Sequence, residues 1–262
     1  MRNIALLIEY DGTAYCGWQI QNNGKSIQGT IEKFLREILR ENVKITGAGR
    51  TDAGAHAVGQ VANFHTHSEW GVEKIVYALN RVLPHDIAIH NGAIVPDEFH
   101  SRYDAVERRY IYRVVTRKSP LSRQFVAHFH YDLSLGLMNE AAGLLVGERS
   151  FRPFSKNQDE QRSFICNVKK AEWQEGKEAN EKDSFLFARS AGLLFDIEAN
   201  RFLHGMVRAI VGSMIDVGRG RISVEDFKRV LSSEDRSTGS MSAPALGLCL
   251  EEVTYLPDPW ND

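Results

Sequence analysis

The sequence predicts an α+β protein with a mainly antiparallel sheet and helices on one side of it. Three observations support this class. Short apolar runs typical of strands alternate with amphipathic stretches typical of helices along the 262 residues. In the first part of the chain these elements follow the order β-α-β-β-α-β, and the second part repeats a variant of it. A hydrophobic fraction of 43% with 25% charged residues is typical of a globular protein that buries a core.

Four strands and two helices are expected in the first part. Ser26 can cap a helix whose apolar positions recur every three or four residues as far as Leu39. A second helix, about 71–83, stops at Pro84, because proline cannot continue a helix. The strands are expected at 4–10, about 43–48, about 57–65 and 87–95. This order of elements is that of the ferredoxin-like fold.

The second part carries similar elements with additions. We expect a helix after Ser134 that ends at Gly147, a helix over 202–218, and a short helix opened by a capping box of Ser223 and Asp226. Strands are expected at 110–116, 125–131, 163–173, 185–197 and 248–255. We therefore predict two ferredoxin-like (RRM-like) domains, an N-terminal one over 1–98 and a C-terminal one over 99–262. Their open sheet faces could hold a large, flat, charged partner.

The charge distribution sets a basic segment apart from a nearly neutral chain. The formal net charge is −2. Between His100 and Phe125, however, seven arginines and lysines stand against two acidic residues. A local excess of this kind can attract a phosphate backbone, although a charge cluster is more often a solvated surface.

The composition also argues against several classes of protein. No apolar run approaches the ~18 residues that a membrane span needs. The N-terminus lacks the long apolar region and cleavage site of a signal peptide, so we expect a cytoplasmic protein without a membrane partner. The cysteines, Cys16, Cys166 and Cys249, are odd in number and far apart, which predicts neither a disulfide framework nor a zinc knuckle.

The segment 47–57 is the main candidate for a functional loop. It places Asp52 two residues after Arg50, between two expected strands that would fix its position. Glycines at 47, 49 and 54 permit backbone angles that a Cβ forbids, and they let a flat ligand come close. A merely solvated hairpin tip explains the spacing equally well, since Asp-Ala-Gly is ordinary turn chemistry.

Two familiar chemistries do not fit this loop. Its glycines match neither the dinucleotide-binding pattern nor a P-loop. A metal site would need His56, His65 and His67 near Asp52, but no further ligand stands at a usual spacing. Hydrogen-bonded or exposed histidines are the better interpretation, and we expect no metal.

A single carboxylate acting on a nucleobase is the third possibility. Such a site needs a cation that keeps the acid ionised, a flat ring that holds the base, and basic groups for phosphates. Arg50 lies beside Asp52, and Arg208 stands alone on an apolar helix, where it either pairs with a carboxylate or extends to solvent. Tyr110 and Tyr112 follow two arginines in the basic strand, where they either contact a nucleotide or pack in the sheet.

The motifs resemble those of the tRNA pseudouridine synthase A family along nearly the whole chain. The segment 49–54, Gly-Arg-Thr-Asp-Ala-Gly, followed by His56, is similar to the active-site motif and is the most specific of the set. Five further segments resemble family motifs in the right order, and they are 8–21, 26–29, 99–112, 202–218 and 243–248.

The resemblance implies an isomerase that converts uridine to pseudouridine in the anticodon stem-loop of tRNA, at positions 38, 39 and 40. It implies Asp52 as the nucleophile on a flipped-out base, Tyr110 as the stacking partner of that base, and Arg208 as the partner of Asp52. Arg50 would assist flipping or hold a phosphate. The resemblance also implies a homodimer that binds tRNA and uses no cofactor.

Two other classes stay open at this point. A non-catalytic RRM-like module would bind tRNA with a steep salt dependence and change no base, but paired RNP-type aromatic motifs are absent from the sequence. A metal-dependent hydrolase using Asp52 and the nearby histidines would be stopped by a chelator.

Overall fold

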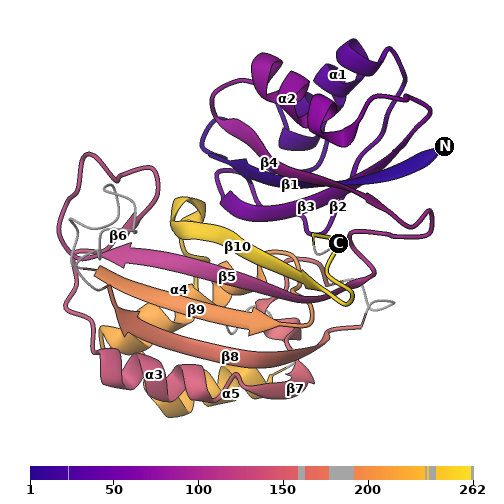
Figure 1. The fold of residues 1–262 in the computed structure, drawn as a ribbon. Coiled ribbons are helices and arrows are strands. Elements are labelled where there is room, and N and C mark those ends of the chain that lie inside the picture. The colour runs from indigo at the N-terminus through magenta and orange to yellow at the C-terminus, as the bar shows by residue number, and fades with distance from the viewer. Residues whose placement is uncertain (23, 159–162, 177–191, 234, 236–239, 261–262) are drawn as a thin grey trace. The chain divides into compact units, whose positions relative to one another are not determined.

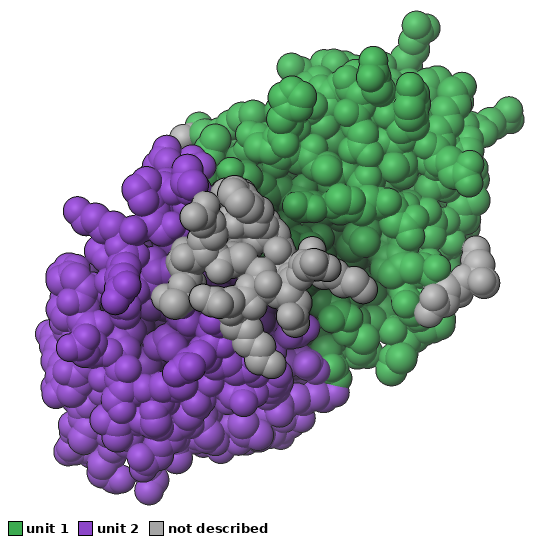
Figure 2. Space-filling view, turned by 60° about the vertical axis from the view of Figure 1, so that its left-hand side comes forward, with its two compact units in different colours: residues 1–108, 249–262 green, residues 109–248 purple. Residues whose placement is uncertain are grey.

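The fold consists of two compact units, each described here by itself. The computed structural model describes residues 1–260 apart from residues 23, 159–162, 177–191, 234 and 236–239. Unit 1 contains residues 1–108 and 249–262, and unit 2 contains residues 109–248 (Figure 2). The units part after Arg108, ten residues beyond the predicted boundary at 98, and the C-terminal strand groups with unit 1.

The predicted order of the first part is the observed order in unit 1. Antiparallel pairing gives the strand order β4-β1-β3, and β2 pairs with β3 on its other side. Its elements are β1 (Arg2–Tyr10), α1 (Ile27–Leu39), β2 (Thr46–Gly47), β3 (His56–Thr66), α2 (Val72–Val82) and β4 (Ile87–Val95). The central strand β1 supplies much of the core, because four of its apolar side chains have no exposed surface.

Both helices of unit 1 lie on the same side of its strands (Figure 1). Helix α1 begins where predicted, because the Ser26 hydroxyl accepts the Gly29 N–H at 3.1 Å. Its apolar face, with Ile27, Ile31 and Leu35, is completely buried. A further strand, β10 (Leu248–Tyr255), joins β3 in parallel through Cys249 and Leu250.

Unit 2 is built around a buried helix. Helix α4 buries twelve of its thirteen residues, and Trp173 connects it to the sheet by stacking on Phe195 and by donating its indole N–H to the Met214 sulfur at 3.4 Å. The strand order is β5-β9-β8-β7, with β6 beside β5. The elements are β5 (Ala105–Val115, which begins in unit 1), β6 (Ala127–His128), α3 (Leu135–Gly143), β7 (Gly147–Ser150), β8 (Ile165–Glu175), β9 (Gly192–Ala199), α4 (Met206–Gly218) and α5 (Val224–Ser232).

Several predictions for the second part were wrong in their boundaries. The strand expected at 125–131 is reduced to the two residues of β6. Helix α3 ends at Gly143, and Gly147, with a φ of 106°, opens the unpredicted strand β7 instead of ending the helix. Helix α4 begins at Met206, because Gly205 takes a left-handed conformation with a φ of 72°.

Other predictions for the second part are confirmed. The capping box of Ser223 and Asp226 opens α5, and β10 has the expected bounds. Strand β8 lies close to its expected position, and β9 begins at Gly192, whereas residues 185–191 lie outside the described part of the chain. None of the helices described has the length and hydrophobicity to span a lipid bilayer.

Candidate active site

The Asp52 side chain lies at the turn of a loop between β2 and β3. The turn is closed by the Ala55 N–H, which donates to the Asp52 carbonyl at 3.1 Å, and by Gly54, whose φ is 78°. Asp52 is half-buried, whereas Arg50 is exposed. The backbone that carries the carboxylate is therefore tied into a hydrogen-bonded turn, as a positioned catalytic group requires.

A second loop, residues 11–20, packs directly against the Asp52 loop. Gly17 has a φ of 103°, and a Cβ there would lie 2.6 Å from the Thr51 carbonyl oxygen. A Cβ on Gly12 would lie only 1.9 Å from the Ala55 carbonyl oxygen. The Trp18 N–H donates to the Thr51 carbonyl at 3.2 Å. Only glycine fits at these two positions. The close backbone contact with the 11–20 loop therefore restricts the position of the Asp52 loop.

Buried polar groups hold the same loop from the sheet side. The Tyr10 hydroxyl and the Thr51 hydroxyl lie 2.8 Å apart in a buried hydrogen bond. The Gln60 amide, which has no exposed surface, donates to the Gly49 carbonyl at 2.9 Å. Residue-level reasoning missed these supports, although two glycines in the 11–20 segment were a visible signal of close backbone contact.

The three histidines considered as metal ligands are not gathered at the loop. His56 begins β3 and accepts the Gly12 N–H on Nδ1 at 3.2 Å, whereas His65 stands near the other end of the strand. Nine residues of extended strand separate them by roughly 30 Å. Across the residues that the structure describes, no group of three His, Cys, Asp or Glu side chains is placed to hold a metal ion.

Two adjacent arginines of the basic segment are bound within the fold. Arg108 is buried in unit 1, where its guanidinium donates to the carbonyls of Ala105 at 2.8 Å and Ala48 at 3.2 Å. Arg109 forms a two-pronged ion pair with Asp196, with both N···O distances at 2.9 Å. Two of the seven basic residues therefore make contacts within the fold.

Asp196 is the centre of an ionic cluster in unit 2. Lys170 joins Arg109 there, at 2.8 Å from the second carboxylate oxygen. Burial of the Asp196 carboxyl favours its protonated form, but hydrogen bonds and charges from Arg109 and Lys170 outweigh burial and hold the pKa of Asp196 below its ordinary value.

The two tyrosines of β5 differ in their surroundings. Tyr110 is buried and meets the Phe202 ring edge-on, with the ring centres 5.1 Å apart. Tyr112 has no exposed surface and donates its hydroxyl to the Pro244 carbonyl at 2.8 Å. Burial raises the pKa of Tyr112, against a smaller lowering effect of the Arg208 charge. Tyr112 is therefore a packing residue, as its strand position allowed.

Arg208 is half-buried on α4 and is held against the segment 241–244. Its Nε donates to the Ala243 carbonyl at 2.8 Å, and its own carbonyl accepts the Ala243 N–H at 2.9 Å. One turn later, a Cβ on Gly212 would lie 2.0 Å from the Met241 carbonyl oxygen, so the helix and this segment touch through backbone. The predicted pairing of Arg208 with Asp52 joins residues of different units and stays a prediction.

Comparisons with known proteins agree with the sequence motifs. The profile of a family described as tRNA pseudouridine synthase matches residues 6–104 and 141–256. The chain is 41% identical over 251 residues to a tRNA pseudouridine synthase A from Bacteroides fragilis, covering 95% of each chain. It is 42% identical over 256 residues to the protein of that name from Chlorobium limicola, covering 97% of this chain and 100% of the relative.

Proposed function

Since this chain belongs to the tRNA pseudouridine synthase family, whose members are isomerases, we propose that it modifies the anticodon stem-loop of tRNA. The targets are the uridines at positions 38, 39 and 40, and Asp52 is the nucleophile. The enzyme acts in the cytoplasm as a homodimer and binds tRNA as its partner.

The observation that carries the proposal is the support of the Asp52 loop. The carboxylate is half-buried on a turn fixed by two glycine contacts from the 11–20 loop and by buried hydrogen bonds of Tyr10 and Gln60. A solvated hairpin tip needs no such support. Fixing a reactive group in place removes much of the entropy cost of reaching the transition state.

The reaction follows from the chemistry of the two isomers. The target base is flipped out of the stem, at a cost on the order of a few kcal/mol. Stacking on Tyr110 returns roughly 1–3 kcal/mol, and Arg50 assists the flipping or holds a phosphate. Asp52 then attacks C1′ of the sugar or C6 of the ring, with Arg208 as its counter-ion.

The atoms of the reaction balance without a co-reactant. The bond between C1′ and N1 breaks, the uracil turns, and a bond forms between C1′ and C5. The bond that Asp52 formed to C1′ or C6 breaks again, and its electron pair returns to the carboxylate. C5 loses its hydrogen as a proton and N1 gains a proton. No electrons are gained or lost overall, so the proposed reaction needs no cofactor.

We also propose that the chain consists of two ferredoxin-like domains, 1–98 and 99–262. In the second, β5, α3, β8, β9, α4 and β10 follow one another in the order β-α-β-β-α-β. The strand order β5-β9-β8 matches the order β1-β3-β2 of unit 1. The short elements β6, β7 and α5 are then insertions into this plan.

The test is tritium release from a tRNA transcript carrying 5-tritiated uridine, in the presence of EDTA. We expect the wild type to release tritium and Asp52→Asn to lose at least about a thousandfold in rate while still binding tRNA, because the amide cannot act as the nucleophile. Asp97→Asn changes an exposed carboxyl of the same unit and is the matched control.

Three outcomes would contradict parts of the proposal. Normal turnover by Asp52→Asn would exclude Asp52 as the nucleophile. Tight binding of the anticodon arm without tritium release would favour a non-catalytic RRM-like binding module. Loss of wild-type activity in EDTA would show that a metal ion is required.

A further inference from the structure

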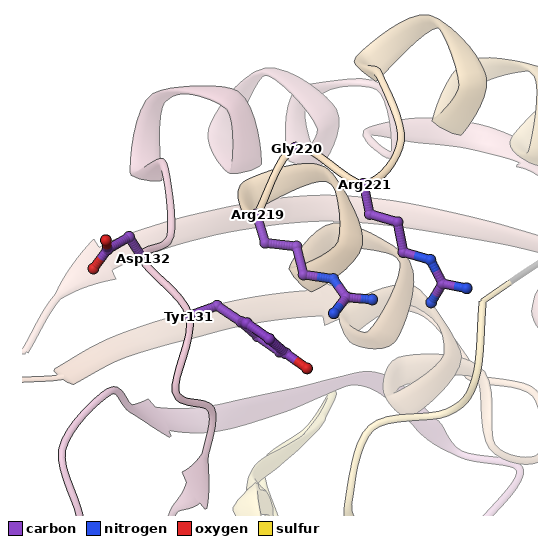
Figure 3. A pocket seen from close by; sticks show the side chains of 5 residues that line it. All are labelled: Tyr131, Asp132, Arg219, Gly220 and Arg221. Carbon is purple, nitrogen blue, oxygen red and sulfur yellow. The ribbon is translucent and has the colours of Figure 1, made fainter.

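Unit 2 carries an open cavity at the end of α4 that the proposed reaction does not use. Its volume is about 610 Å³, and it is lined by Tyr131, Asp132, Arg219, Gly220 and Arg221 (Figure 3). We refer to it as the Tyr131 pocket. Pockets that bind small ligands span roughly 300–1,000 Å³, so this one is large enough for a nucleotide.

The pocket contains a flat, rigid surface made of a ring and a guanidinium. The Arg219 guanidinium lies over the Tyr131 ring, 4.6 Å from its centre. Its Nε also donates to the Asp216 carboxylate at 2.8 Å, and Asp216 is only 7% exposed. Because a buried carboxylate fixes Arg219 from one side and Tyr131 from the other, the stacked pair is held before any ligand arrives.

Two guanidiniums line the pocket, and the carboxylates of Asp132 and Asp216 balance them in formal charge. Arg221 lies 3.4 Å from the second oxygen of Asp216, and its side chain is 66% exposed. Two guanidiniums thus share one carboxylate. Asp132 is the acidic residue of the lining, and its side chain points away from both guanidiniums (Figure 3). Most donors of Arg221 are therefore available to an anion.

The C-terminal end of α4 is capped by backbone N–H groups, which reduces its electrostatic repulsion of an anion. The last carbonyls of a helix carry partial negative charge. Here the Asp216 carbonyl accepts the N–H groups of both Arg221 at 2.9 Å and Ile222 at 3.3 Å. Gly220, with a φ of 72°, makes this turn, and the side chains of Arg219 and Arg221 extend from it in the same direction (Figure 3).

Two histidine rings lie next to Tyr131 in the sequence and in space. The ring centres of His128 and His130 lie 6.0 Å apart, and those of His130 and Tyr131 lie 4.8 Å apart. Both histidines are exposed. Flat rings beside fixed guanidiniums are the surfaces on which proteins stack unpaired bases while arginines contact the phosphates.

We propose that the Tyr131 pocket is a second RNA-contact site that holds an unpaired nucleotide of tRNA other than the target uridine. The base lies against the Tyr131–Arg219 stack, and its phosphate is bound by Arg221. The inference rests on the proposed function, because that function makes tRNA the partner.

The test compares Arg221→Ala with Arg229→Ala. Arg229 is also an exposed arginine of unit 2 that pairs with one carboxylate, but it lies on α5 outside the pocket. The dissociation constant of full-length tRNA is measured at several salt concentrations, and KM and kcat are measured by tritium release. We expect Arg221→Ala to weaken binding roughly three- to tenfold and to reduce the salt slope by about 0.7–0.9, as loss of one phosphate contact predicts. Its KM should rise while kcat stays within twofold, and Arg229→Ala should match the wild type.

A second variant tests the stacking surface. Tyr131→Leu should weaken tRNA binding by roughly fivefold or more without changing the salt slope, because base stacking does not depend on salt as a phosphate contact does. Ultraviolet crosslinking of the complex should join RNA to the peptide that contains Tyr131.

The outcomes separate this inference from the proposed function. If the wild type modifies tRNA but Arg221→Ala and Tyr131→Leu bind tRNA like the wild type, the second site is wrong and the proposed function stands. If the wild type binds tRNA through Arg221 but releases no tritium, the proposed function is wrong and the site stands. Equal weakening by Arg229→Ala would show a general charge effect and would overturn the inference.

Discussion

In unit 1 the loop that carries Asp52 is supported by glycine contacts and neutral hydrogen bonds, whereas the strand of unit 2 that carries Tyr110 is supported by an ionic cluster around the buried carboxylate of Asp196. The Asp52 loop is fixed by the glycine contacts of Gly12 and Gly17 and by the Tyr10–Thr51 hydrogen bond. In unit 2, Asp196 binds Arg109, the residue directly before Tyr110. The supports named for the Asp52 loop are backbone contacts and a hydrogen bond between hydroxyls, whereas the support of the strand before Tyr110 is an ion pair whose strength depends on pH.

Backbone contact through glycine is common to both units. Gly17 touches the Asp52 loop, and Gly212 lets α4, the helix of Arg208, touch the segment 241–244. The first contact involves a left-handed residue in a loop, and the second involves a helical residue in the core. Substitution at each position should therefore have a different main effect, on activity in unit 1 and on stability in unit 2.

The largest expected effect comes from Gly17→Ala. A Cβ at this position meets the Thr51 carbonyl at 2.6 Å and strains a left-handed backbone, so the Asp52 loop must shift. A displacement of about 1 Å can cost on the order of a hundredfold in rate, which we expect in kcat of the tritium assay. Gly71→Ala, with no atom within 4 Å of its Cβ, is the control in the same unit. Equal kcat values for the two variants would remove the 11–20 loop from the catalytic argument.

Gly212→Ala should act on stability instead. A Cβ there would lie 2.0 Å from the Met241 carbonyl oxygen, and overpacking of this kind outweighs the gain in helix propensity by about 2 kcal/mol. Urea unfolding followed by circular dichroism measures the loss. Gly143→Ala in α3 meets no atom and should stabilise unit 2 slightly. An unchanged urea midpoint for Gly212→Ala would mean that the segment 241–244 can shift to accommodate the Cβ without loss of stability.

Asp196→Asn tests the ionic cluster and should lower the free energy of unfolding by about 1.5 kcal/mol at pH 7. The expected loss is moderate because both cationic partners are partly exposed to solvent. The lowered pKa of Asp196 means that its stabilising contribution is present above the ordinary aspartate pKa and is lost as the pH falls through the folded-state value. The stability gap between wild type and variant should therefore close in acid. A gap that stays constant down to pH 2 would show that the charge is not the cause.

Tyr10→Phe should have the smallest effect. We expect the free energy of unfolding to fall by about 1 kcal/mol, because only one buried hydrogen bond is removed and the ring stays. In contrast to Asp196→Asn, this loss should not vary between pH 3 and pH 7, since neither hydroxyl titrates there. Unfolding curves at the two pH values measure it. A strong pH dependence would contradict the neutral support that we assign to unit 1.

The sequence predicted periodic elements better than irregular ones. The helix after Ser26 and the strands at 87–95 and 248–255 were found because apolar spacing and caps define them locally. The strand expected at 125–131 was wrong, since its alternating residues belong mostly to a loop and only Ala127 and His128 form pairs. Pairing partners distant in sequence decide such cases, and local patterns do not contain them.

The sequence singles out candidate site residues, but it does not reveal the contacts that support their loop. Asp52 stood out through flanking glycines and the family motif. The ion pair of Arg109 with Asp196 joins residues far apart in the sequence, so charge counting alone placed Arg109 on a basic face. The same holds for Arg108, whose burial against backbone carbonyls has no signature in the sequence around it.

The parallel pairing of β10 with the start of β3 has a consequence for biosynthesis. Cys249 and Leu250 pair with His56 and Ala57, which directly follow the Asp52 loop. On the ribosome, β3 emerges long before β10, so the nascent chain presents an incompletely paired strand next to the Asp52 loop while unit 2 is being made. Until translation reaches β10, the edge beside Ala57 can bind other extended segments, and chaperones that shield such edges would protect this intermediate. The strand that follows the Asp52 loop therefore gains its β10 partner only late in synthesis.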